Sequence, residues 1–123
     1  MIRTHAAPWM LLLAVALAPA AAPAATTAGQ ACEKASSDAL RSCVASVARL
    51  GQRCYRTTGS ACLAGDAKVE SQLDRVQSRV LARCLDQATV QAAGYGPALT
   101  PEGLVARVQS ACTTTVASFA ARS

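Results

Sequence analysis

Six cysteines constrain the fold of this chain more than any other feature of its sequence. Their successive separations are 11, 11, 8, 22 and 28 residues, at positions Cys32, Cys43, Cys54, Cys62, Cys84 and Cys112. An even number of cysteines in a short exported chain is typical of a disulfide framework. The interpretation of these cysteines therefore depends on whether the chain is exported.

Residues 1–24 predict a cleavable export signal. Arg3 gives a basic start, residues 9–18 are apolar, and small residues follow up to a cleavage motif that ends at Ala24. The apolar stretch is shorter than the roughly 20 residues that span a bilayer, so we expect no transmembrane anchor. We expect a secreted or periplasmic mature protein of 99 of the 123 residues, with only three aromatic side chains. A core of this size needs reinforcement.

The expected mature chain shows the period of amphipathic helices in three segments. Apolar residues recur at steps of three and four over residues 32–57, over residues 67–85, and from Pro101 to near the C-terminus. We find no alternating pattern of the kind that predicts strands. The sequence therefore predicts an all-α fold, a small disulfide-stapled up-down-up bundle of three helices.

Two shorter features complete the expected organisation. Residues 25–31 are either a linker or the fraying start of the first helix, and residues 32–123 form the Cys-rich helical domain. Asp86 can cap a short continuation of the second helix that ends near Ala93, because its carboxylate can accept free backbone N–H groups.

Helix geometry restricts how the cysteines pair. Cys32, Cys43 and Cys54 follow at steps of about three turns, so they share one face and lie about 16 Å apart along the axis. Disulfide partners need Cα atoms within about 7 Å, so each of the three must bond to a cysteine outside its own helix. With antiparallel first and second helices, we predict the pairs Cys32–Cys84, Cys43–Cys112 and Cys54–Cys62.

Metal binding is the alternative use of the cysteines. Zinc or copper(I) sites usually contain C-x-x-C pairs, or pairs four residues apart on a helix, and this chain has neither. We therefore predict structural disulfides, no metal site and no cofactor.

Catalytic residues are not predicted. His5 is the only histidine and lies in the expected signal, so the mature chain has no imidazole for a triad, a general base or a metal site. Glu70 and Asp74 are four residues apart on one helical face, where a solvated pair is the ordinary explanation. We expect a protein that is not an enzyme.

Two rows of arginine, at steps of three or four, form a candidate anion-binding surface: Arg49, Arg53 and Arg56, then Arg75, Arg79 and Arg83. Such rows suit an anionic partner, such as lipid headgroups or lipopolysaccharide. A solvated face whose arginine stems cover an Ala-rich core is the default interpretation, since the mature net charge is only about +4, from 11 basic and 7 acidic residues. Nucleic acid is not expected, because the chain is expected to be exported and has few aromatic residues for base stacking.

The segments RVLARCLDQATVQAAGYG and LVARVQSAC resemble uncharacterised Cys-rich helical modules of exported bacterial proteins. The shared features are a basic helix that ends in Cys84, a Gly-aromatic-Gly turn at residues 94–96, and a last helix that carries Cys112. The resemblance covers most of residues 32–120 and implies no known activity, hence no catalytic residues.

Three functions remain open from the sequence. The first is a non-enzymatic exported structural or interaction module that meets another protein or an acidic envelope component. The second is a carrier of a small apolar ligand, with a cavity lined by Val, Leu and Phe119 between disulfide-tied helices. The third is a cationic protein that acts on membranes.

Overall fold

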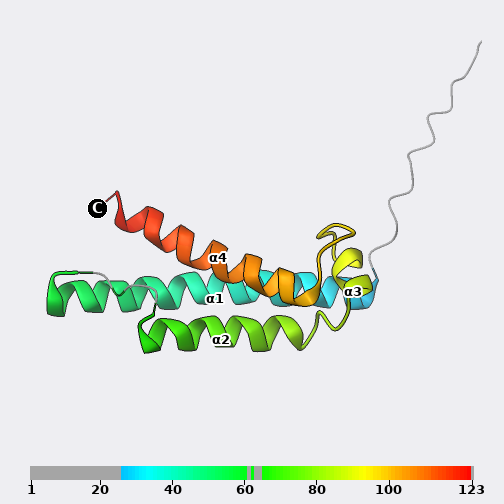
Figure 1. Cartoon of the computed structure of the whole chain (residues 1–123), viewed down its shortest axis with the longest axis horizontal. Coiled ribbons are helices and arrows are strands. Elements are labelled where there is room, and N and C mark those ends of the chain that lie inside the picture. The colour runs from blue at the N-terminus through cyan, green and yellow to red at the C-terminus, as the bar shows by residue number, and fades with distance from the viewer. Residues whose placement is uncertain (1–25, 61, 63–64, 123) are drawn as a thin grey trace, which may run out of the picture.

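The computed structural model describes residues 26–60, 62 and 65–122, and these residues form helices and no strand (Figure 1). The four helices are α1 (Thr27–Thr58), α2 (Ala67–Leu81), α3 (Gln87–Ala92) and α4 (Pro101–Ala120). The all-α prediction is confirmed for this part of the chain. The expected signal, residues 1–24, lies outside the described residues.

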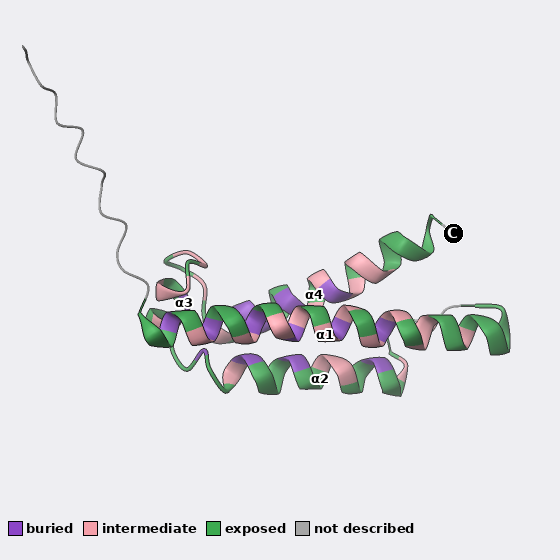
Figure 2. Cartoon of the chain, turned by 180° about the vertical axis from the view of Figure 1, so that it is seen from behind, coloured by how far each residue is buried: buried purple, intermediate pink, exposed green. Residues whose placement is uncertain are grey.

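The longest helix, α1, is the element that the other three contact. α2 runs antiparallel to α1, α3 crosses near the first turns of α1, and α4 starts at that end and runs in the direction of α1 (Figure 1). The C-terminal part of α4 diverges from α1 (Figure 1), and residues 117–122 are exposed. Figure 2 shows the same change, with exposed residues on the last turns of α1 and α4.

The start of α1 lies earlier than it would if residues 25–31 were a linker, the first of the two alternatives that the sequence left open. The helix begins at Thr27, and the Thr26 hydroxyl accepts a hydrogen bond from the Gly29 N–H at 2.9 Å. Hydroxyl side chains at this position satisfy backbone donors that the helix leaves free. Residues 27–31 are therefore part of the helix, and the prediction of a linker there was wrong.

The end of α2 also differs from the prediction, which continued this helix to residue 85. The helix ends at Leu81, and the N–H groups of Arg83 and Cys84 both donate to the Val80 carbonyl, at 3.1 Å and 2.8 Å. This tight last turn takes Cys84 off the helix axis and toward α1. Asp86 then caps α3, a helix that begins after a break and does not continue α2.

The core consists of small apolar side chains and sulfur. Its buried members are four cysteines, one alanine, one leucine and seven valines: Cys32, Ala39, Cys43, Val47, Val69, Val76, Val80, Cys84, Val90, Leu104, Val105, Val108 and Cys112. Ser36 is also buried, and its hydroxyl donates to the Cys32 carbonyl at 2.9 Å, so its polar group is satisfied. Residues this small bury little area each, which makes covalent cross-links valuable.

Three disulfides tie the helices together. The structure has the same three pairs that helix geometry predicts, with Cα–Cα distances of 4.8, 5.9 and 5.5 Å for Cys32–Cys84, Cys43–Cys112 and Cys54–Cys62. The first two are buried and join α1 to the segment after α2 and to α4. The third is half-buried and holds the chain after α1 against its last turns. No helix among the described residues is long and apolar enough to cross a membrane.

Candidate anion-binding groove

A groove of about 410 Å³ lies between α1 and α2, and six of its eight lining residues have polar side chains. Its residues are Ser46, Arg49, Leu50 and Arg53 from α1, and Ala67, Lys68, Ser71 and Gln72 from α2. The lining thus contains three cations, two hydroxyls and one amide, and no carboxylate. Such a lining suits an anionic group that also carries hydrogen-bonding atoms.

The α1 wall of the groove follows from helical spacing. From Ser46, the other lining residues follow at spacings of three, four and seven residues: Arg49, Leu50 and Arg53. These spacings place all four on one face of the helix. Leu50 packs against the core, while the two arginines are exposed. The Arg49 Nε–H donates to the Ala45 carbonyl at 3.2 Å, which directs this side chain along its own helix and leaves its terminal amino groups available.

The α2 wall of the larger hollow contains one cation and two polar side chains, and no acid. Lys68 and Gln72 are four residues apart and line the groove together. Glu70 and Asp74 line neither hollow, although Asp74 lies three residues from Ser71 and seven from Ala67, which both line the larger one. Glu70 Oε1 instead accepts a hydrogen bond from the Gly65 N–H at 3.1 Å. The acidic pair of the sequence is thus not part of the groove lining.

A second, much smaller hollow of about 10 Å³ continues the groove toward the other end of α2. Ala39, Ser42, Cys43, Gln72, Arg75, Val76 and Arg79 line it, and Gln72 lines both hollows. Together the two hollows bring five cations to one side of the α1–α2 pair. We call these residues the groove cations: Arg49, Arg53, Lys68, Arg75 and Arg79.

Carboxylates do not neutralise the groove cations. The ion pairs among the described residues join Asp38 to Lys34, at 2.5 Å, and to Arg41, at 2.6 Å. The hydrogen bond from Lys34 lowers the pKa of Asp38, and Arg41 acts in the same direction. Both partners are outside the groove, so its positive charge stays available to a ligand.

The arginine rows of the sequence divide in the structure. Arg49 and Arg53 line the larger hollow and Arg75 and Arg79 the smaller, whereas Arg56 and Arg83 line neither. Sequence reasoning did not include Lys68, Ser46, Ser71 or Gln72. Lys68 shares a helical face with Arg75 and Arg79, at spacings of seven and eleven residues, and that periodicity was the available signal.

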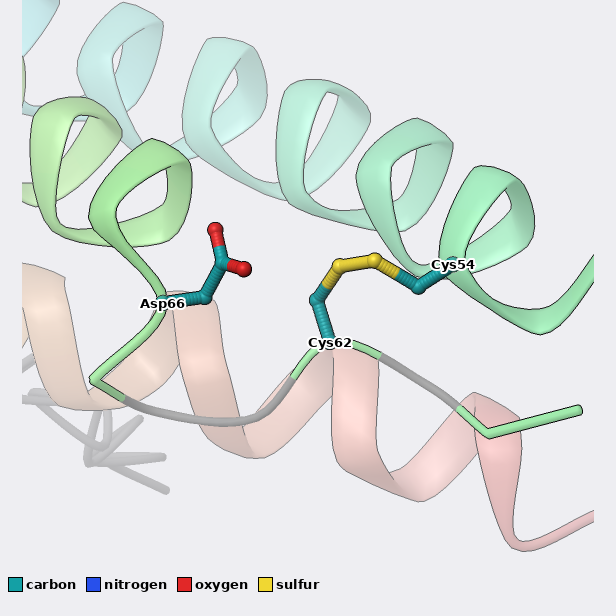
Figure 3. Close-up of side chains that lie close together, drawn as sticks. All are labelled: Cys54, Cys62 and Asp66. Carbon is teal, nitrogen blue, oxygen red and sulfur yellow. A yellow bond between two sulfur atoms is a disulfide. The ribbon is translucent and has the colours of Figure 1, made fainter. Parts of the chain in front are cut away.

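Asp66 lies beside the half-buried disulfide (Figure 3). The Cys54 and Cys62 sulfurs and an Asp66 oxygen lie within 4.8 Å of one another. Metal ions bind thiolates, and two sulfurs joined in a disulfide provide none. Asp66 Oδ1 accepts a hydrogen bond from the Lys68 N–H at 2.9 Å, the cap of α2. Asp66 thus caps the helix that carries Lys68, and the two cysteines form a structural cross-link.

No protein-family model, curated protein or solved structure matches this chain. The resemblance to Cys-rich helical modules of exported bacterial proteins therefore stays a prediction. The fold and the site define an all-α, disulfide-tied protein with a cationic groove between its two antiparallel helices.

Proposed function

We propose that this chain is a non-enzymatic exported interaction module, and that the groove between α1 and α2 binds anionic groups of an acidic envelope component. The observation that carries this proposal is the set of five groove cations, exposed and unpaired with carboxylates, on one side of two helices. A concentrated positive field attracts anionic ligands and raises their association rate.

Export is part of this proposal. The expected signal at residues 1–24 and the three disulfides both support a non-cytosolic compartment, because disulfides persist where the environment is oxidising. We also propose that α1, α2 and α4 act as one disulfide-tied three-helix bundle that holds the groove in shape. The cross-links from α1 to Cys84 and Cys112 support this rigidity.

The other two functions are less well supported. A carrier would need an apolar cavity, but three cations are part of the lining of the hollow with room for a small ligand, and Phe119 is 58% exposed. Membrane action by insertion would favour an amphipathic helix with bulky apolar residues beside the cations. The bulky apolar residues beside the groove cations are Leu50 and Val76, and Val76 is buried, so Leu50 alone is partly exposed there.

Chromatography of the mature, oxidised protein on a sulfated dextran matrix tests the proposed groove. We expect the variant Arg49→Gln/Arg53→Gln to elute at lower NaCl concentration than the wild type. Its matched control is Arg107→Gln/Arg122→Gln, which removes the same charge from exposed positions on and after α4. Equal elution of the two variants would show that only net charge matters, and would contradict a groove site.

A further inference from the structure

We infer that the ligand of the groove is a linear acidic polysaccharide that lies along α1 and α2, occupies the wide hollow and contacts the exposed Arg75 and Arg79 beyond it. This inference rests on the proposed function and specifies its ligand. The shared chemistry is a chain of sugar units with repeated sulfate, phosphate or carboxylate groups. A single small anion would fill only one end of the site.

The length of the site is the first argument. Lys68 and Arg79 are eleven residues apart on one face of α2, which corresponds to about 16 Å along the axis. Ser42 and Arg53 are also eleven residues apart on the facing side of α1. Because the helices are antiparallel, Arg53 meets the Lys68 end and Ser42 the Arg79 end. The site is therefore an elongated track with cations at both ends.

The distribution of charge and space along the track is the second argument. The wide hollow, of about 410 Å³, has Arg49, Arg53 and Lys68 in its lining. Arg75 and Arg79 border the narrow one, whose volume of about 10 Å³ holds about one water molecule and no sugar unit, so a ligand would meet these two arginines at the surface. A small oxyanion at the wide end would leave the two arginines at the narrow end unpaired. An extended polyanion can place one unit in the wide hollow and continue over Gln72, which lines both.

The uncharged side chains of the track decide the class of polyanion. Ser42, Ser46, Ser71 and Gln72 offer hydroxyl and amide groups, which can both donate to and accept from sugar hydroxyls. No aromatic residue lines either hollow, and single-stranded nucleic acids are usually held by aromatic stacking. A lipid surface is flat, and would contact the exposed rim rather than fill a groove.

Calorimetric titration of the mature, oxidised protein with sulfated oligosaccharides tests the inference. The probes are a sulfated disaccharide, too short to span both hollows, and a sulfated octasaccharide. We expect the octasaccharide to bind about tenfold or more tightly than the disaccharide, and about 1.4 kcal/mol corresponds to each tenfold step. A carboxylated oligosaccharide of equal length separates a requirement for sulfate or phosphate from a requirement for negative charge alone.

Two double variants locate the binding. Arg75→Gln/Arg79→Gln should weaken octasaccharide binding and leave disaccharide binding unchanged, whereas Arg49→Gln/Arg53→Gln should weaken both. All four arginines are exposed, so we expect these variants to fold, with circular dichroism and thiol assays as the check.

The outcomes separate this inference from the proposed function. If both oligosaccharides bind equally and the Arg75/Arg79 variant behaves like the wild type, the extended track is wrong but the anion-binding groove stands. If vesicles of anionic lipid bind through the groove and the saccharides do not, the ligand class is wrong. If no anion binds through Arg49 and Arg53, both the inference and the proposed function fail.

Discussion

Gly29 in α1 lies directly against Ala92 at the end of α3: a Cβ atom on Gly29 would stand 2.7 Å from the Ala92 carbonyl oxygen. Real Cβ atoms do not approach backbone oxygen this closely, so Gly29→Ala must push α3 away from α1. We expect this variant to lose about 1–3 kcal/mol of unfolding free energy, the usual cost of overpacking. Urea denaturation followed by circular dichroism measures it.

Gly51 in the same helix provides the matched control. A Cβ atom on Gly51 would meet no atom of another segment within 4 Å, so Gly51→Ala gains helix propensity without a clash. We expect it to stabilise the protein by roughly 0.5–1 kcal/mol. The two identical substitutions should therefore change stability in opposite directions, and a loss at both sites would refute the packing argument.

Reduction should open the three disulfides in a defined order. Cys54 and Cys62 are half-buried, whereas the cysteines of the other two pairs are at most 2% exposed. A reductant reaches an accessible sulfur first, so we expect Cys54 and Cys62 to be the first thiols labelled in a mild reduction series. Alkylation and peptide mass spectrometry identify them. Early labelling of Cys43 or Cys112 would contradict this order.

Removing a single disulfide should cost more stability when the loop that it closes is longer. The Cys54–Cys62 loop spans 8 residues and the Cys43–Cys112 loop 69. In the chain-entropy model these correspond to about 2.5 and about 4.5 kcal/mol. We expect Cys54→Ser/Cys62→Ser to melt at a higher temperature than Cys43→Ala/Cys112→Ala, and the reverse order would contradict the prediction.

Acid should destabilise the protein through the cap of α3. The hydrogen bond from the Thr89 backbone N–H to Asp86 Oδ1, at 2.7 Å, lowers the pKa of Asp86 in the folded state. A carboxyl whose folded pKa is lowered stabilises the fold above its unfolded pKa of about 3.9, and this contribution disappears as pH falls through the folded value. Melting temperature should therefore decrease as pH falls below about 4.

Asp86→Asn isolates this contribution. Asparagine caps helices about as well as aspartate but does not titrate. The variant should show a weaker decrease in melting temperature over the same acid range than the wild type. The remaining decrease would include Asp38, whose pKa the hydrogen bond from Lys34 lowers. An identical pH profile for variant and wild type would remove Asp86 from the explanation.

Local patterns in the sequence predicted most of the helices and the disulfide pairs, but not where two helices begin or end. The apolar period continued through Cys84 with no Gly or Pro to interrupt it, so nothing local indicated that α2 ends at Leu81. Residues 27–31 are helical and pack against α3. Gly29 contacts Ala92, which is 63 residues away in the sequence, so no local pattern indicates this contact. Both differences thus depend on contacts between distant segments.

The candidate site was predictable only in part for the same reason. Helical spacing identifies which arginines share a face, as for Arg49 and Arg53. Helical spacing does not show which face of α2 these arginines meet. The packing of α2 against α1 brings Lys68 into the groove and leaves Arg56 out of it. A groove between two helices depends on their axial register, which here follows from the disulfides at Cys32 and Cys54.

The two buried disulfides span overlapping stretches of the chain, from Cys32 to Cys84 and from Cys43 to Cys112. Every peptide bond between Cys32 and Cys112 therefore lies inside at least one covalent ring. A protease that cuts once in any connection between these helices produces two peptides that stay joined by a disulfide. The two helices that form the groove, α1 and α2, therefore cannot separate after such a cut. Complete dissociation of such a nicked molecule also requires a reductant.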